Sequence, residues 1–172
     1  KYSPLDQIHA GNVADLRVAW RWSSPDNEIA KANPQAQPGA YEDTPLMANG
    51  VLYTFTALGV IVAIDPASGK TIWQYDPETW KAGRPTNLGF LHRGLAYWTD
   101  GASERLLAGT HDAYLMSVDA KTGRPDPAFG AGGRVDLTER LAFAERVRNY
   151  TVTSAPVIVR NIVIAGAGIS DG

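Results

Sequence analysis

The alternation of apolar and polar positions predicts a chain made mostly of short β-strands. The clearest stretch runs from Val60 to Asp76. Its first part, Val60 to Ile64, is a continuous apolar run with the length of a buried strand, and Lys70 to Tyr75 alternates polar and large apolar residues. Between them, Asp65 to Gly69 has the composition of a tight turn, because Pro presets φ, Asp accepts backbone hydrogen bonds and Gly adopts a positive φ. The stretch therefore predicts an antiparallel hairpin that carries Trp73 on its second strand.

The same pattern returns further along the chain. Leu115 to Arg124 repeats the strand, the Asp, the turn Gly and the basic residue about 54 residues downstream. The preceding strand, Val51 to Thr56, matches Arg105 to Thr110 at the same offset, and Thr44 to Val51 matches Ala155 to Ile162 at about twice that offset. Three copies of a strand–turn–strand unit predict a repeat β architecture. The period fits a β-propeller with four-stranded blades and long connecting loops.

The predicted blades follow one another along the chain. The first full blade opens at Tyr41 and closes near Tyr75, the second opens at Arg93, and the third opens at Thr151. The sequence stops at Gly172, before the turn and the Trp strand of the third blade. A half-built blade exposes unpaired strand edges, which isolated folds avoid. We therefore expect residues 1–172 to be the N-terminal part of a single, longer propeller domain.

Other segments are expected to connect or flank the blades. Arg17 to Trp22 alternates and predicts a strand with both of its Trp residues on one face, and Asn12 is expected to cap a helical turn that reaches Asp15. Residues 23–40 and 77–91 have the composition of loops. Leu137 to Val147 has a helical period and predicts a short helix outside the propeller core.

Composition narrows the classes of function. The 172 residues include 16 Lys and Arg against 18 Asp and Glu, a formal net charge of −2, so charge gives no reason to expect nucleic acid or an anionic membrane as a partner. No apolar run approaches the ~18 residues that a membrane helix needs, and no signal peptide is visible. Cysteine is absent, which excludes disulfides, thiolate metal ligands and a Cys nucleophile within this sequence and leaves the redox compartment open.

Five stretches that together span nearly the whole chain carry a family resemblance. They are Tyr2 to Ile8 with Val18 to Trp20, Glu42 to Leu46, Asp65 to Trp73, Arg93 to Trp98, and Asp119 to Pro125 followed by Phe129 and Gly130, and Thr153 to Pro156 fits as well. They resemble the pyrroloquinoline quinone (PQQ)-dependent dehydrogenases, with the nearest likeness to the glucose dehydrogenase-like and related sugar or alcohol quinoproteins. The hairpin repeat alone is moderately specific, whereas the block from Arg93 to Trp98 is far more telling. The resemblance implies an all-β, eight-bladed propeller, of which roughly the first two to three blades are present, with PQQ and Ca2+ near its axis.

The resemblance also implies which residues approach the cofactor. PQQ is a planar tricarboxylate o-quinone that carries the two-electron chemistry while the protein positions it. Arg93 matches the family Arg on a PQQ carboxylate, Glu42 matches a carboxylate that contacts the cofactor, and Thr153 matches a hydroxyl on the quinone carboxylate. Gly168 stands beside the cofactor where the alcohol enzymes have a Ser, and Asp171 falls, within one or two positions, where the family has a Ca2+ ligand.

Residue type alone allows ordinary structural roles for these positions. Residue type by itself favours a surface or inter-blade salt bridge for Arg93 and a surface position on an edge strand for Glu42. It allows an ordinary strand position for Thr153, and it suits a plain turn as well as a Ca2+ ligand at Asp171. His92, directly before Arg93, either approaches the cofactor or is a solvated loop residue. His9 and His111 have no partners at metal-ligand spacing and are interpreted as structural.

One departure from the family pattern precedes Arg93. The alcohol dehydrogenases have a vicinal Cys pair at the positions that Asn87 and Leu88 occupy here, so that disulfide ring is missing. Glucose-type enzymes lack the pair too, and this difference favours the glucose-type group.

The resemblance implies an oxidoreductase that oxidises the hydroxyl group of a sugar or alcohol by hydride transfer to PQQ with Ca2+ assistance. The family's catalytic residues lie in later blades, so no catalytic residue is assigned here and we expect the fragment to be inactive alone. Also implied are a periplasmic location, soluble or membrane-associated, and an electron acceptor such as cytochrome c or ubiquinone. Two alternatives remain. One is a non-catalytic propeller of the same repeat that acts as a scaffold in outer-membrane protein assembly, and the other is a carbohydrate-binding propeller, which only the scattered Trp residues favour.

Overall fold

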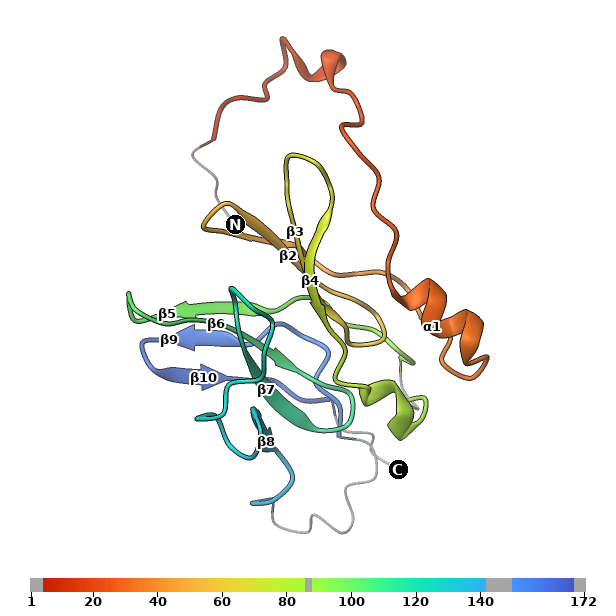
Figure 1. Cartoon of the computed structure of the whole chain (residues 1–172), viewed down its shortest axis with the longest axis vertical. Helices are drawn as coiled ribbons and strands as arrows, with labels where there is room; N and C mark the ends of the chain where they lie inside the picture. Colours follow the sequence, from red (N-terminus) through yellow and green to blue (C-terminus); the bar gives the residue numbers. More distant parts are fainter. Residues whose placement is uncertain (1–4, 86–87, 142–149, 169–172) are drawn as a thin grey trace.

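The structure, a computed structural model, describes residues 5–85, 88–141 and 150–168. These residues form two four-stranded sheets and one two-stranded sheet, each built from consecutive antiparallel strands (Figure 1). The strands are β1 (Leu46–Ala48), β2 (Val51–Phe55), β3 (Ile61–Ile64) and β4 (Thr71–Tyr75); β5 (Ala96–Thr99), β6 (Glu104–Gly109), β7 (Tyr114–Asp119) and β8 (Arg134–Asp136); and β9 (Val157–Val159) and β10 (Ile162–Ile164). The sheets are the predicted blades in the predicted order, so the all-β repeat architecture is confirmed.

The turn chemistry of the predicted hairpin is the same in the first two sheets. Asp65 Oδ1 accepts hydrogen bonds from the amides two and three residues further on, at 2.8 and 2.9 Å, and Gly69 closes the turn with a φ of +70°. Asp119 Oδ1 and Gly123 repeat both features, with distances of 3.1 and 2.8 Å and again a φ of +70°. Asp is the acceptor that such a turn needs and Gly tolerates its left-handed end.

Two tryptophans pack directly on these turn glycines. The ring of Trp73 in β4 lies against Gly123, where an added Cβ would be 2.4 Å from a ring carbon, and Trp20 lies against Gly69, where the distance would be 2.5 Å. In both pairs the indole Nε1 donates to the backbone carbonyl three residues before the glycine, at 3.2 and 2.9 Å. We call these two rings the docked tryptophans. Because a side chain on either glycine would overlap the ring, glycine is required for this contact.

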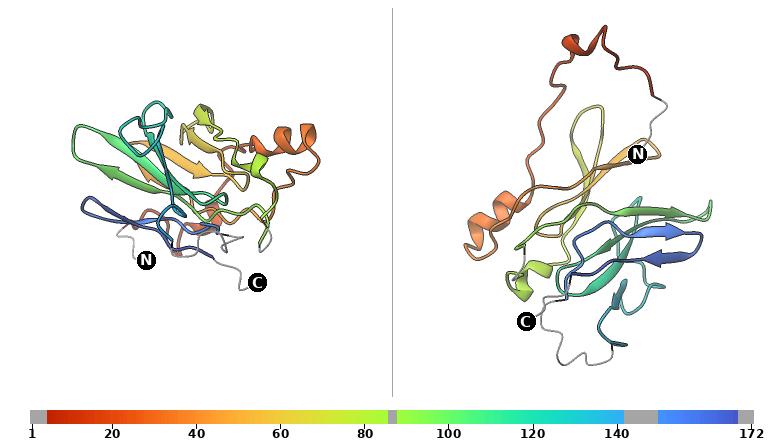
Figure 2. Two further views of the ribbon diagram at one scale, coloured as in Figure 1. Left: turned by 90° about the horizontal axis from the view of Figure 1, so that it is seen from below. Right: turned by 180° about the vertical axis from the view of Figure 1, so that it is seen from behind.

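The first two sheets share one apolar core. It contains Tyr53, Phe55, Ile61 and Ala63 from the first sheet and Leu95, Leu106, Ala108, Met116, Val118 and Ala120 from the second. The first strands of the sheets, β1, β5 and β9, are neighbours in that order, and Figure 2 shows the sheets stacked in chain order. This arrangement is that of adjacent propeller blades.

Two predictions for the segments before the first sheet were wrong. Arg17 to Trp22 runs extended without forming a strand, although Trp20 and Trp22 both pack over the same cluster of Val60, Val62 and Ile64, as the alternation indicated. Residues 23–40 contain a helix, α1 (Asp26–Ala32), in place of a plain loop. Pro25 stands at its N-cap, where proline does not disturb a helix, and Asp26 is buried against the first sheet. A polar, proline-containing segment was therefore mistaken for a loop.

The other expected elements agree with the structure only in part. A 3-10 turn, η1 (Val13–Asp15), lies where the helical turn was predicted, but the side chain of Asn12 does not cap it. A second 3-10 turn, η2 (Thr79–Ala82), lies within the predicted loop 77–91. Of the helix predicted for residues 137–147, residues 137–140 form bends and turns, residue 141 has no regular structure, and the remainder lies outside the described residues. Neither α1 nor the 3-10 turns of the described ranges have the length and apolar character of a membrane-crossing helix.

Candidate functional site

Three segments that lead into the first strands of the sheets lie side by side. These lead-in segments are residues 41–45 before β1, 92–95 before β5, and 151–156 before β9. The Thr44 amide donates to the Arg93 carbonyl at 3.4 Å, and the Arg93 amide donates to the Thr153 carbonyl at 2.8 Å. Side chains from three separate sheets are thereby brought to one place, although they are 51 and 60 positions apart in the chain.

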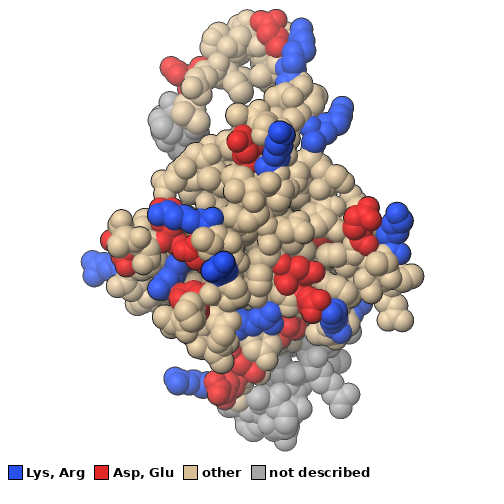
Figure 3. Space-filling view, viewed as in Figure 1, with Lys and Arg blue, Asp and Glu red and all other residues tan. Residues whose placement is uncertain are grey.

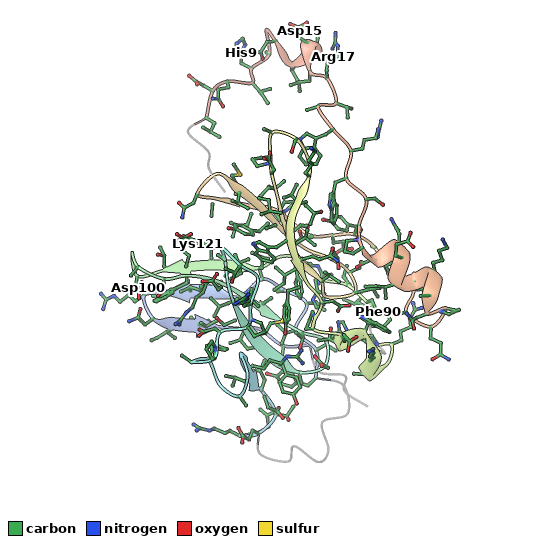
Figure 4. The ribbon with its side chains drawn as sticks, viewed as in Figure 1. His9, Asp15, Arg17, Phe90, Asp100 and Lys121 are labelled. Carbon is green, nitrogen blue, oxygen red and sulfur yellow. The ribbon has the colours of Figure 1, made fainter. Side chains whose placement is uncertain are left out.

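The lead-in segments and the turns of the hairpins lie at different ends of the sheets. In Figure 4, Phe90, just before the second lead-in segment, lies on the side of α1, whereas Asp100 and Lys121 lie at the opposite end of the sheets. Figure 3 shows basic and acidic side chains interspersed over the face that it draws, without a large area of one sign. On that face, the distribution of charge marks no binding area.

Glu42, Arg93 and Thr153 meet through the guanidinium group. Arg93 Nε donates to Glu42 Oε2 at 3.0 Å, and Arg93 Nη1 donates to Thr153 Oγ1 at 3.0 Å. No described residue bonds the remaining nitrogen, Nη2. The side chains of Arg93 and Glu42 are 38% and 46% exposed, so the group is accessible from outside. We call this cluster the guanidinium site.

The donor set of the guanidinium site fits a ligand that presents carboxylates. A guanidinium group offers donors in a planar fork that matches a carboxylate, and the Thr153 hydroxyl adds a further polar group beside it. Glu42 aligns the fork and partly compensates its charge. Among the described residues there is no group of three or more His, Cys, Asp or Glu side chains that could hold a metal ion.

Gly94 lies where the lead-in segments meet, in a backbone conformation that favours glycine. It follows Arg93 with a φ of +139°, and an added Cβ would lie 3.4 Å from Ala155 Cβ and 3.6 Å from the Thr44 carbonyl oxygen. Gly168 pairs with Thr151 in the third lead-in segment through two backbone bonds of 2.8 and 3.1 Å. As a glycine, it contributes no side chain to the guanidinium site. Asp171, the predicted Ca2+ ligand, lies outside the described residues.

A buried histidine pair next to the guanidinium site was not predicted. His92 is neither solvated nor facing the site, because it is 1% exposed and its Nε2 lies 3.1 Å from His111 Nδ1. The Phe55 ring stacks against it with centroids 4.1 Å apart. Burial, and then the neighbouring His111, lower the pKa of His92 well below its usual value, and burial also lowers the pKa of His111. Nothing local in the sequence marks this pair, since His92 precedes β5, His111 lies between β6 and β7, and the two rings meet only through the fold of the second sheet.

The repeated four-stranded sheets, the docked tryptophans and the converging lead-in segments define a β-propeller with a site at the lead-in end of its blades. The comparison with protein families then places the chain within that class. All 172 residues match the family described as PQQ glucose/ethanol/alcohol dehydrogenase, β-propeller domain, and the chain belongs to this family.

Individual relatives agree with this assignment. The chain is 34% identical, over 99% of its length, to the dehydrogenase subunit of a quinone alcohol dehydrogenase from Gluconacetobacter polyoxogenes, and 31% identical, over 99%, to a quinoprotein glucose dehydrogenase from Gluconobacter oxydans. The crystal structure of a quinohemoprotein alcohol dehydrogenase from Comamonas testosteroni matches 97% of the chain with a TM-score of 0.70 and 30% identity. The chain spans 20%, 22% and 21% of these proteins respectively.

Proposed function

We propose that this protein is a PQQ-dependent dehydrogenase that oxidises the hydroxyl group of an alcohol or a sugar, and that the guanidinium site holds a carboxylate of the cofactor. The observation that carries the proposal is the convergence of Arg93, Glu42 and Thr153 from three blades in a family whose members are named for PQQ. A scaffold protein has no evident need for an exposed, hydrogen-bonded guanidinium group at this place.

The residues of this chain bind and orient. Arg93 donates from its planar fork to the cofactor carboxylate, Thr153 adds its hydroxyl, and Glu42 fixes the rotation of the guanidinium group while contacting the cofactor edge. Gly168, which pairs with Thr151 through its backbone, brings no side chain to the cofactor. When bound, PQQ supplies the two-electron chemistry. Asp171, as a hard carboxylate donor, is proposed to ligate Ca2+.

The finer features of the activity are also proposals. The relatives include both an alcohol dehydrogenase and a glucose dehydrogenase, so the substrate is proposed as an alcohol or a sugar. The absence of a Cys pair at Asn87 and Leu88 favours the glucose-type group. We further propose a periplasmic location and an electron acceptor such as cytochrome c or ubiquinone.

The experiment is dye-linked reduction by the intact protein in the presence of PQQ and Ca2+, with glucose and with short alcohols as substrates. We expect reduction that depends on PQQ and on one of these substrates. Arg93→Gln should abolish or strongly reduce it at limiting PQQ. Arg17→Gln is the matched control, because this arginine lies on the segment far from the sheets in Figure 4. Absence of reduction with every sugar and alcohol would favour the scaffold alternative.

A further inference from the structure

The two residues that flank Glu42 are both fastened to a single hydroxyl on β2. Thr54 Oγ1 donates to Asp43 Oδ2 at 2.5 Å, and the Tyr41 hydroxyl bonds the same Thr54 oxygen. Thr54 has only one hydroxyl proton and gives it to the carboxylate, so Tyr41 is the donor in the second bond. The Phe55 amide also donates to Asp43 Oδ2, at 3.2 Å. Positions 41 and 43 are therefore held to β2 on either side of Glu42.

The Glu42–Arg93 ion pair is too weak to hold the lead-in segment by itself. Both side chains are more than a third exposed, and exposed ion pairs contribute about 0–1 kcal/mol. Thr54, in contrast, is 2% exposed, and a hydrogen bond from its hydroxyl to a charged carboxylate contributes about 1.5–3 kcal/mol. The position of Glu42 is thus set mainly by the bonds of its two neighbours.

An Asp at position 43 costs free energy that an apolar side chain of similar size would not cost. Burial raises the pKa of its carboxyl group, and its second oxygen, Oδ1, is buried without a hydrogen-bond partner among the described residues. That oxygen lies 3.7 Å from where a Cβ on Gly94 would be, so it faces the residue after Arg93. Buried polar atoms without partners are rare in folded proteins and call for an explanation.

We propose that Tyr41, Thr54 and Asp43 are positioning residues, which form a brace that holds Glu42 against Arg93 and thereby sets the affinity of the guanidinium site for PQQ. The brace rests on the proposed function for its ligand. We expect it to form in the protein without PQQ as well, because every bond in it joins residues of this chain. Loss of the brace frees the backbone at Glu42, and part of the binding energy is then spent on ordering it.

The chain contains a matched control two residues away. Thr56 Oγ1 donates to Asp26 Oδ1 at 2.6 Å, and the Leu58 amide donates to Asp26 Oδ2 at 3.2 Å. This is again a buried Thr hydroxyl that donates to an Asp carboxylate, helped by one backbone amide, although Asp26 is buried and Asp43 only partly buried. It fastens α1 to the first sheet, however, and not Glu42. A general loss of stability should therefore follow from changes in either pair, whereas a loss of cofactor affinity should follow only from changes in the brace.

The test is the dissociation constant of PQQ, measured by titration of the intact protein, together with the thermal unfolding midpoint of each variant. We expect Thr54→Val and Asp43→Ala to weaken binding about 10-fold, and Tyr41→Phe, which removes one hydroxyl from a half-exposed ring, about 3-fold. Thr56→Val should lower the unfolding midpoint but change affinity less than about 2-fold. Thr54→Ser and Asp43→Asn keep the bonding atoms and should restore binding.

A second readout does not need the cofactor. In the protein without PQQ, Thr54→Val should accelerate amide hydrogen exchange at residues 41–44, and Thr56→Val should not. The brace is refuted if Thr54→Val leaves affinity and exchange unchanged, or if Thr56→Val weakens binding as much as Thr54→Val does. If the proposed function is wrong, the result is different: Arg93→Gln leaves the affinity for PQQ unchanged. The exchange rates then still decide whether the brace orders Glu42.

Discussion

At the turn end of the sheets, Trp73 and Gly123 touch so closely that an added Cβ would be 2.4 Å from the ring. At the lead-in end, Arg93 meets Glu42 and Thr153 through two hydrogen bonds of 3.0 Å between side chains that stay partly exposed. The contact between Trp73 and Gly123 depends on shape, because an added side-chain carbon on the glycine would overlap the ring. The second contact depends on charge and donor geometry, and we expect a change of side chain there to leave the sheets and their shared core intact.

The difference implies that stability and cofactor binding can be separated. Changes at the docked tryptophans should lower the free energy of unfolding, and changes at the guanidinium site should lower affinity for PQQ with little effect on unfolding. Each prediction below either sharpens this division or breaks it.

The largest effect is expected for Gly123→Ala. Alanine there meets both the strain of a φ of +70° and the ring of Trp73, so we expect a loss of about 3 kcal/mol in the free energy of unfolding, measured by denaturant titration. Gly50→Ala is the control, because Gly50 has a φ of +78° with nothing within 4 Å of the added Cβ, and it should cost only about 1 kcal/mol. Equal losses in both variants would contradict a role for the ring contact.

Arg93→Gln should weaken PQQ binding about 30-fold, because it removes the charge and the fork while the free energy of unfolding changes by less than about 0.5 kcal/mol. Arg93→Lys retains the charge without the fork and should weaken binding about 10-fold. Titration of both variants with PQQ measures these effects. A lysine variant with parental affinity would show that charge alone suffices.

The buried His92–His111 pair predicts a loss of stability in acid. Both pKa values are lowered in the folded protein, so the unfolded chain takes up protons first as the pH falls. The free energy of unfolding should therefore decrease below about pH 6.5, with a slope of at most about 1.4 kcal/mol per pH unit for each ring. The raised pKa values of Asp26 and Asp43 act in the opposite sense, because they favour the folded state as these groups become protonated at lower pH.

Unfolding titrations between pH 7.5 and 5 measure this dependence. The His111→Gln variant should be less stable at neutral pH but should show a flatter profile. A parental slope in that variant would exclude the pair as its source. PQQ binding is expected to follow this profile only through unfolding, since neither ring faces the guanidinium site.

The smallest effect is expected for Thr153→Val. It removes one hydroxyl from the guanidinium site while keeping the branched shape, and should weaken PQQ binding about 5-fold. Thr153→Ser, which retains the hydroxyl, should bind like the parent. A valine variant with full affinity would leave Arg93 as the main determinant of binding in this chain.

The sequence predicted those parts of the fold that are determined by residues close together in the chain. The Asp65 to Gly69 turn is encoded within a few residues, and the period of its repeat predicted the sheets and their order. The strand predicted for Arg17 to Trp22 was wrong because the alternation reflects the packing of Trp20 and Trp22 on the first sheet rather than strand pairing. The helix α1 was missed because the residue that anchors it, Asp26, is a charged group that looks solvent-exposed in a sequence.

The candidate site was predictable only through family resemblance. Nothing local in the sequence connects Glu42, Arg93 and Thr153, which meet because three lead-in segments lie side by side. The histidine pair and the Thr54–Asp43 bond depend on contacts between separate elements and were missed. These contacts form only once the chain is folded, and no regular spacing of residues in the sequence predicts them.

The most direct test of the account is a structure of the intact protein with PQQ bound. The account predicts a carboxylate of PQQ within hydrogen-bond distance of the Arg93 guanidinium group, with Thr153 and Glu42 still in contact with Arg93. PQQ bound elsewhere, with Arg93 engaged only by Glu42 and Thr153, would contradict it.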